Sequence, residues 1–167
     1  MTSKKGFTLV ELLIVIAIIS ILSSIVIASV RVARLKAYNA KAQADGNQLR
    51  TAILQLEGDT VQLPNHLSAS SCTENVATYS LTASAPTGIV QNDTTPYPNW
   101  KGPYSDSVPN DPWNRNYRFS KWYTCNGQIG CTGIANGTRV RAIFSQGING
   151  ADDLGVGSDD IVTVLCI

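Results

Sequence analysis

Residues 7 to 30 read FTLVELLIVIAIISILSSIVIASV, and this stretch decides how the rest of the chain is organised. Its 24 residues include one ionisable side chain, Glu11. About 20 apolar residues of helix cross the hydrocarbon core of a bilayer, so the stretch predicts a transmembrane helix. A glycine, Gly6, comes directly before the apolar run, whereas a secretory leader places its small-residue cleavage site after the run. A cut between Gly6 and Phe7 would remove a short basic leader and leave the helix as the new N-terminus.

The longer stretch KKGFTLVELLIVIAIISILSS resembles the class III leader and N-terminal helix of type IV pilins and type II secretion pseudopilins. The resemblance rests on a cleavage site, Gly6 and Phe7, that is followed closely by the carboxylate of Glu11. It implies that a prepilin peptidase cuts after Gly6 and methylates the new amine of Phe7. It also implies that mature subunits form a helical filament, with minor pseudopilins or pilins and an inner-membrane assembly platform as partners.

Glu11 can also be interpreted from physical chemistry alone. A carboxylate near the middle of a membrane helix costs roughly 2.5 to 3.5 kcal/mol on insertion scales, so such a residue usually has a partner. The family resemblance supplies one, the N-terminal amine of Phe7 in a neighbouring subunit. The alternative is a plain anchor helix that tolerates a glutamate, which leaves the order of leader and apolar run unexplained.

Charged residues on both sides of the apolar run bear on its orientation. Lys4 and Lys5 lie immediately before the run, which by the positive-inside rule places the leader in the cytoplasm and the head outside. Arg31 and Arg34 follow the run and favour the opposite orientation, so charge alone leaves the topology undecided. The leader motif favours a single-pass protein of the cytoplasmic membrane whose assembled filament is periplasmic or on the cell surface.

A chain of 167 residues suits one modest domain plus its anchor. Beyond the apolar run, small and apolar residues recur at steps of three and four, which predicts that the helix continues as an amphipathic one. The predicted parts are a leader over residues 1–6, a transmembrane or filament-core helix over 7–30, an amphipathic helix over 31–57 and a globular head over 58–167.

Two sets of apolar residues mark the amphipathic continuation. Gly46 lies where the pattern slips by one residue, so it predicts a weak point or bend. The second set is expected to pack on the head, and Gly58 with Asp59 is expected to end the helix. The first set is Val30, Ala33, Ala37, Ala40 and Ala44, and the second is Leu49, Ala52, Ile53 and Leu56.

Four stretches of the head have the composition of β-strands. They are residues 76–81, 117–124, 138–145 and 161–166. The third stretch alternates in a way that suits a sheet with one face packed on the helix and the other partly exposed to water. The predicted fold class is therefore α+β, a pilin-like arrangement of a long N-terminal helix against a small antiparallel sheet.

Four cysteines, Cys72, Cys125, Cys131 and Cys166, lie in the part of the chain that is expected to be exported. An even number of cysteines in an oxidising compartment favours disulfides, with three possible connectivities. Zinc is the rival explanation, but the chain has no CxxC motif and one histidine, His66. Cys125 and Cys131 flank a turn-rich segment, which favours a local disulfide and leaves Cys72 to pair with Cys166.

A second motif, GPYSDSVPNDPWNRNYRF, contains turn residues and a tryptophan that can fix a loop on the core. This segment also resembles the GPY and DPW segment of the major pseudopilins of type II secretion. The resemblance favours that subfamily over pilins in general. The matching residues are Gly102, Pro103, Tyr104, Pro109, Asp111, Pro112, Trp113, Asn116 and Tyr117.

Before the last predicted strand, the segment FSQGINGADDLGVGSDDIV is rich in glycine and contains four aspartates, Asp152, Asp153, Asp159 and Asp160. Such a loop offers the oxygen ligands that Ca²⁺ prefers. By composition alone, a solvated loop held by its own turns is the favoured reading.

The same segment resembles the calcium loop of the major pseudopilins, S-x-G-x-D-G followed by D-D-I. It departs from that pattern at Asn149, where the family has aspartate, and by three extra residues. Asn149 can still offer its amide oxygen, and Asp152 or Asp153 can restore the charge. The resemblance therefore implies that Ca²⁺ is bound by Asn149, Asp152, Asp159 and Asp160.

The remaining motifs do not support an enzyme. The chain has one histidine, no GxSxG and no nucleotide fingerprint, so no nucleophile, base or phosphate cradle is supported. No nucleic-acid partner is expected either, because the basic residues after the apolar run are expected in a filament or against lipid headgroups. The hypothesis is a structural filament subunit, most like the major pseudopilin of a type II secretion system. The alternatives are a type IV pilin for adhesion, motility or DNA uptake, and a membrane-anchored binding module.

Overall fold

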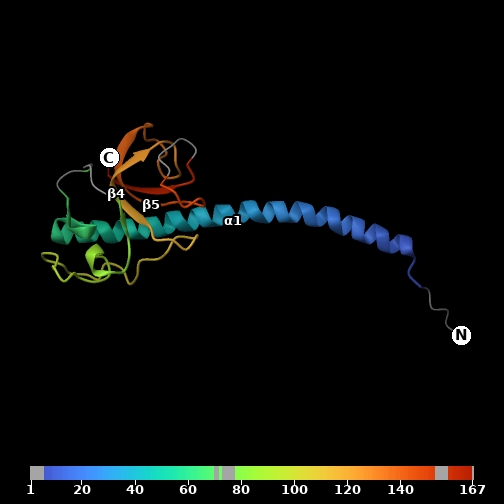
Figure 1. The fold of residues 1–167 in the computed structure, drawn as a ribbon, viewed down its shortest axis with the longest axis horizontal. Helices are drawn as coiled ribbons and strands as arrows, with labels where there is room; N and C mark the ends of the chain where they lie inside the picture. The colour runs from blue at the N-terminus through green and yellow to red at the C-terminus, as the bar shows by residue number, and fades with distance from the viewer. Residues whose placement is uncertain (1–5, 70–71, 73–77, 153–157, 167) are drawn as a thin grey trace. The chain divides into compact units, whose positions relative to one another are not determined.

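A single long helix, α1 (Leu9–Thr60), begins close to the N-terminus of the chain, and a small antiparallel sheet follows it (Figure 1). The chain divides into two compact units, and the division falls inside α1, after Tyr38. The helix ends three residues later than residue 57, the predicted end. The computed structural model describes residues 6–69, 72, 78–152 and 158–166.

In the first unit, α1 is apolar and its side chains are exposed. Its most apolar 18-residue window has a mean hydropathy of 2.9, and none of that window is buried within the chain. Three serines in this part satisfy their hydroxyl groups locally: Ser20 donates to the Ile16 carbonyl at 2.7 Å, and Ser24 and Ser29 donate similarly one turn back. The helix is therefore long and apolar enough to cross a membrane, with these hydroxyl groups bonded internally.

In the second unit, α1 buries a stripe of residues at steps of three and four. The stripe agrees with the second apolar set predicted from the sequence. Ala40 and Ala44, which the first set placed on the apolar face, are exposed instead, because each lies two residues from the buried Ala42 and so falls on another face of the helix. The most deeply buried apolar residues of the stripe are Ala42, Leu49, Ala52, Ile53 and Leu56.

Gly46 belongs to this stripe, and the predicted bend is not found there. The helix continues through Gly46, and a Cβ added at that position would overlap the side chain of Thr163. The glycine thus allows the helix backbone to approach the last strand closely. Its role is packing, which the pattern of apolar residues along the helix does not reveal.

The main sheet has four antiparallel strands in the order β3 (Tyr79–Ser80), β4 (Arg118–Cys125), β5 (Thr138–Ser145) and β6 (Ile161–Cys166). The last three strands confirm the predicted stretches to within one residue. β3 is the end of the first predicted stretch, of which residues 76 and 77 lie outside the described part of the chain.

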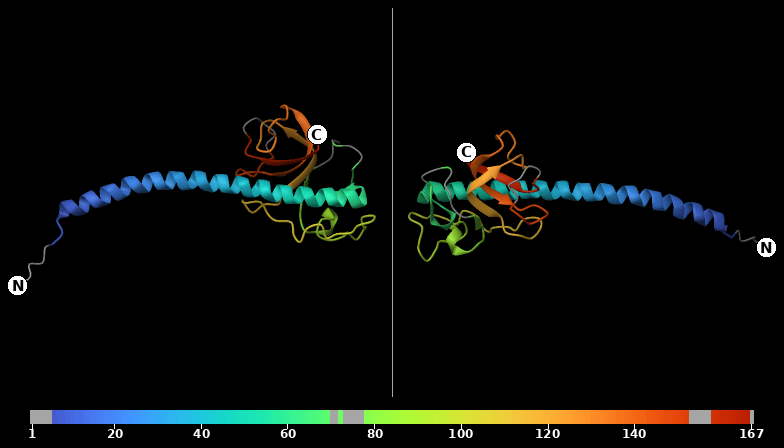
Figure 2. Two further views of the ribbon diagram at one scale, coloured as in Figure 1. Left: turned by 180° about the vertical axis from the view of Figure 1, so that it is seen from behind. Right: turned by 45° about the horizontal axis from the view of Figure 1, so that its top comes forward.

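A short segment after α1 forms a separate two-stranded sheet. Its strands are β1 (Gln62–Leu63) and β2 (Leu67–Ser68), joined by the 3-10 turn η1 (Pro64–His66). A second 3-10 turn, η2 (Ala85–Thr87), follows β3. Within the second unit, strands β4 to β6 lie along one side of the helix and the segment around η2 lies along another (Figures 1 and 2).

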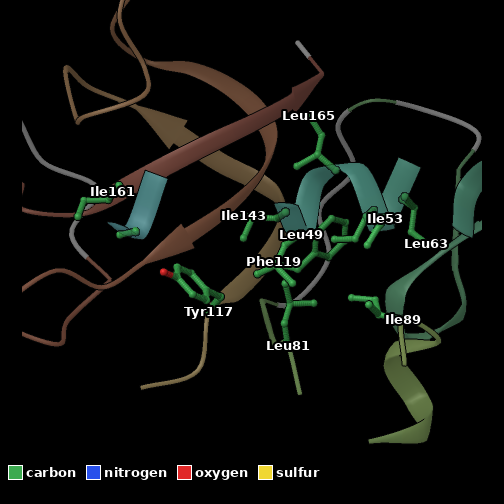
Figure 3. Close-up of a cluster of buried hydrophobic side chains, with 12 residues drawn as sticks. Leu49, Ile53, Leu63, Leu81, Ile89, Tyr117, Phe119, Ile143, Ile161 and Leu165 are labelled. Carbon is green, nitrogen blue, oxygen red and sulfur yellow. The ribbon is translucent and has the colours of Figure 1, made fainter. Parts of the chain in front are cut away.

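The first hydrophobic core joins the helix to the sheet. Leu49 and Ile53 of α1 contact a cluster that includes Phe119 of β4 and Ile143 of β5, and Figure 3 shows these side chains converging. All four are at most 1% exposed. This packing confirms the predicted α+β class, a helix against a small antiparallel sheet.

A second core covers the opposite face of the sheet, which corrects the prediction of a partly wet face. Tyr123, Val140 and Phe144 are at most 2% exposed, and they pack together with Cys125 and Cys131. The segment between β4 and β5 supplies this cover, since Ile134 packs against the same cluster. Strand β5 is therefore buried on both faces from Val140 to Ser145, whereas the alternation of its residues predicted one buried face.

Both predicted disulfides are present. Cys125 and Cys131 are joined within the turn after β4, and Cys72 is joined to Cys166 at the end of β6. The second bond spans 94 residues of sequence and ties the segment after β2 to the last strand. A crosslink of that span strongly limits the unfolded chain, so it adds more stability than a short one in the chain-entropy model.

Candidate functional site

The first candidate site is the start of α1, which the sequence assigned to cleavage and assembly. Gly6 and Phe7 precede the helix, and Phe7 is 85% exposed. A Cβ added at Gly6 would meet nothing else in the chain. The peptide bond between these residues is therefore open to an enzyme.

Glu11 forms a reciprocal cap with Thr8 at this end of the helix. The backbone N–H and the hydroxyl of Thr8 donate to Glu11 Oε2 at 2.9 and 2.8 Å, and the Glu11 N–H donates to Thr8 Oγ1 at 3.3 Å. This is a capping box, which satisfies two N–H groups that a helix N-terminus leaves open. The T-x-x-E spacing in the sequence is typical of such a box, although from the sequence we considered Glu11 as a partner for an amine or as a glutamate that an anchor helix tolerates.

The cap places the Glu11 carboxylate at the positive end of the helix dipole, within reach of the chain's own first amides. A partner that takes the Glu11 carboxylate away from this cap must bind it more strongly than these hydrogen bonds do. The pairing of Glu11 with the Phe7 amine of a neighbour involves a second chain, so it stays a prediction.

Past this cap, the first unit exposes a continuous apolar surface. Such a surface on one chain marks contact with lipid or with other protein. The exposed fractions range from 41% at Val30 to 75% at Leu9. Its large residues include Leu12, Leu13, Ile16, Ile19, Leu22, Ile25 and Val26.

The second candidate site begins at the turn of residues 110–116, named here the DPW turn. The Asp111 side chain is fully buried. Its Oδ1 accepts the backbone N–H groups of Trp113 and Arg115 at 3.0 and 2.8 Å, and its Oδ2 accepts the Ser145 hydroxyl at 2.6 Å. Asp111 therefore organises the turn and ties it to the end of β5, as the sequence predicted for a loop fixed on the core.

The acidic loop, residues 145–160, contains the four expected calcium ligands, and its described part does not bring them together. Asp159 Oδ2 accepts the Asn149 N–H at 2.9 Å, so these two residues adjoin. Asp160 is fully buried, and its Oδ2 accepts the Tyr123 hydroxyl at 2.7 Å. Asp152 accepts Gln146 Nε2 at 2.7 Å and lies 3.4 Å from an Arg118 nitrogen.

Asp159 and Asp160, which directly precede β6, thus have different partners. Among the described residues, no group of three or more histidine, cysteine or acidic side chains is placed to hold a metal. Asp153 lies outside the described part of the chain. The described carboxylates of the loop do not form a shared set of ligands, and calcium binding stays a prediction.

Two arginines beside this loop were not singled out from the sequence. Arg115 Nη2 donates to the Gly147 carbonyl, and Arg118 pairs with Asp152. Neither contact can be predicted from sequence spacing, since Arg115 lies in the DPW turn, Arg118 begins β4, and their partners in the loop are 32 and 34 residues away. The loop thus meets two guanidinium groups from the protein itself.

The GPY part of the second motif contacts the end of α1. Tyr104 donates its hydroxyl to Asp59 Oδ2 at 3.1 Å, and Lys101 Nζ lies 3.0 Å from Asp59 Oδ1. The hydrogen bond from Lys101 lowers the pKa of Asp59, and burial raises the pKa of Tyr104. Nearer the middle of α1, burial likewise raises the pKa of Tyr117, whose hydroxyl donates to Asp45 at 3.0 Å.

A further contact fixes the segment after α1. His66 Nε2 lies 3.0 Å from Asp93 Oδ2, and the hydrogen bond from His66 lowers the pKa of Asp93. The His66 ring stacks on Tyr97 with centroids 3.9 Å apart. Tyr97 donates to the Pro86 carbonyl at 2.6 Å, so this cluster joins η1 to η2.

Comparison with known proteins supplies two family matches. Residues 1–27 match the family model described as the prokaryotic N-terminal methylation motif. Residues 30–133 match the model described as type II secretion system protein G, a range that ends before the acidic loop. The type II secretion system core protein G of Vibrio cholerae serotype O1 is 30% identical over 121 residues, which cover 71% of this chain and 72% of that protein. No solved structure matches the chain.

Proposed function

The chain belongs to the type II secretion system protein G family and acts as a major pseudopilin, and we propose how it is processed, anchored and assembled. A prepilin peptidase cuts after Gly6 and methylates the new amine of Phe7. The mature subunit then moves from the membrane into a filament. The methylation-motif match over residues 1–27 and the open Gly6–Phe7 bond support this order of events.

One observation carries the assembly proposal: the large apolar side chains of α1 between Leu9 and Val30 are exposed, whereas from Ala42 onward one face of the same helix is buried by its own chain. A surface of that size needs lipid before assembly and other copies of the helix afterwards. The filament core is then a bundle of these helices. Each subunit would bury its apolar half against its neighbours.

The proposed partners follow from this route. They are further copies of the chain, minor pseudopilins, the prepilin peptidase and an inner-membrane assembly platform. The head lies on the periplasmic side, since Lys4 and Lys5 favour a cytoplasmic leader. Extension of the filament would push exported proteins through an outer channel. The protein G match favours this role over a type IV pilin for adhesion, motility or DNA uptake, and over a membrane-anchored binding module.

The test separates the charge of Glu11 from its capping role. Glu11→Gln keeps a side chain that can complete the capping box but removes the charge. If the carboxylate pairs with the Phe7 amine of a neighbour, its loss leaves a buried cation unpaired, which costs about 3 to 5 kcal/mol. The yield of sheared filaments should then fall by about a hundredfold or more.

Thr8→Ala is the matched control, because it removes the cap and leaves the charge. Losing a cap costs about 1 kcal/mol, so the filament yield should fall by no more than about fivefold. Membrane insertion of each variant is checked by fractionation, and mass spectrometry of sheared filaments should show methylated Phe7 at the N-terminus. A normal filament yield from Glu11→Gln, or an intact leader on assembled subunits, would contradict the proposal.

A further inference from the structure

The described first half of the acidic loop turns around the guanidinium group of Arg115, and we infer that Arg115 is the resident cation of this part of the loop. In that role Arg115 supplies the positive charge that holds the loop to the DPW turn, where the family resemblance expects Ca²⁺. The folded head then does not depend on calcium. This inference goes beyond the proposed function, because it concerns what stabilises the head before any filament forms.

The DPW turn fixes the position of Arg115. The backbone N–H of Arg115 donates to Asp111 Oδ1 at 2.8 Å, and its carbonyl accepts the Asp111 N–H at 2.7 Å. Asn110 and Asn116 form a bridge on either side of the turn. Because its N–H and its carbonyl are both hydrogen-bonded, the backbone of Arg115 is fixed and its side chain can extend in few directions. That side chain is 30% exposed.

The guanidinium reaches into the first half of the acidic loop. Its Nη2 donates to the Gly147 carbonyl, and a Cβ added at Gly150 would overlap Nη1. The chain turns around it, since the Gly150 N–H donates to the Gln146 carbonyl at 3.1 Å. Gly147 and Gly150 both have positive φ, at +59° and +74°, so both fit this turn without the strain that a side chain would add.

The charges around Arg115 favour a cation. Its Nε lies 3.8 Å from the buried carboxylate of Asp111. Asp159 adjoins the same turn, because a Cβ added at Gly147 would lie 2.6 Å from Asp159 Oδ2. On the outer side of the loop, Arg118 neutralises Asp152 at 3.4 Å. Two carboxylates in this region, Asp111 and Asp152, thus lie near guanidinium groups.

A calcium ion bound to the same turn would conflict with this arrangement. Ca²⁺ takes six to eight oxygen ligands, and the Gly147 carbonyl already accepts from Arg115. A divalent cation beside that carbonyl would also face a like charge on the guanidinium. Asp160, which the resemblance assigns as a ligand, is turned toward Tyr123. The like charge of Arg115 therefore disfavours Ca²⁺ at the Gly147 carbonyl.

The experiment measures the thermal unfolding of the full-length chain in detergent, with millimolar Ca²⁺ or with chelator. Intrinsic fluorescence reports on the head, because the chain's three tryptophans all lie between residues 100 and 122. The wild-type midpoint should be the same in calcium and in chelator. Arg115→Gln removes the charge, so its midpoint in chelator should fall by about 5 °C, whereas Arg115→Lys should recover a large part of that loss.

Arg50→Gln makes the same chemical change at an exposed position of α1 and should leave the midpoint unchanged. A wild-type midpoint that rises by about 5 °C or more in calcium would overturn the inference. So would an Arg115→Gln variant as stable as wild type in chelator. If Arg115→Gln does not fold, calorimetric titration of the wild-type chain with Ca²⁺ decides the matter. Absence of binding at millimolar Ca²⁺ supports the inference, and stoichiometric binding overturns it.

Discussion

The apolar side chains at the two ends of α1 are covered in different ways. Near its start, Leu13 is 52% exposed within the chain, whereas Leu49 near its end is fully buried. Both are leucines on one continuous helix, with similar helix propensity and similar hydrophobicity. The two leucines differ in which atoms cover their side chains. Leu49 is covered by the sheet of its own chain, and Leu13 must be covered by lipid or by other subunits.

This difference changes what each residue contributes. A side chain buried within the chain adds to the stability of the folded monomer. One that is exposed in the monomer adds nothing until a partner arrives. The helix therefore combines a folding element and an assembly element, and substitutions in the two parts should have separable effects.

The largest expected effect comes from removing Leu49. Leu49→Ala deletes buried atoms and leaves a cavity in the first core, so the free energy of unfolding of the head should fall by about 2 to 5 kcal/mol. Leu13→Ala should leave that free energy unchanged while lowering filament yield. The free energy of unfolding of both variants is measured by chemical denaturation of the full-length chain in detergent, followed by tryptophan fluorescence. Filament yield is measured from sheared filaments. An equal loss of head stability in the two variants would remove the distinction between the two parts of the helix.

A smaller effect is expected at Gly46, where close packing rather than cavity formation is tested. Gly46→Ala introduces a Cβ that overlaps Thr163, and overpacking of this kind costs about 1 to 3 kcal/mol. Thr163→Ala in the same chain should restore most of the loss. Gly58→Ala is the control, because its Cβ meets nothing and should stabilise the helix by up to about 1 kcal/mol. Additive losses at Gly46 and Thr163 would show that the two do not interact.

The smallest effect concerns the contact between Asp59 and Lys101 at the end of α1. The pKa of Asp59 is lowered in the folded chain from its ordinary value of 3.8. The ionised carboxylate therefore stabilises the head at a pH above that ordinary pKa. That contribution is lost as the pH falls below this value through the folded pKa. Asp59→Asn should therefore be slightly less stable than wild type at neutral pH, and the gap should close on acidification. Lys101→Gln should reproduce the same pH dependence of the thermal midpoint, and a gap that persists in acid would point to a cause other than charge.

Much of this protein was determined by the sequence itself. The unbroken apolar run and the order Gly6, Phe7, Glu11 predicted the membrane helix and its processing motif, because length, hydropathy and a cleavage pattern are local properties. The three long strands were predicted for the same reason. Cys125 and Cys131 were paired correctly because they flank a short turn, which left one partner for Cys72.

Other features were decided by the tertiary structure, because they depend on segments that are distant in sequence. Gly46 permits close packing on Thr163 rather than a bend, and the pattern along the helix contains no trace of that strand. Strand β5 is buried on both faces, since the segment between β4 and β5, with Cys131 and Ile134, covers the second one. The aspartates of the acidic loop suggested a metal cation, whereas the cation that we infer there is Arg115, which the fold of the DPW turn places against Gly147. Composition gives the charge of a loop, and only the packed chain shows which partner neutralises it.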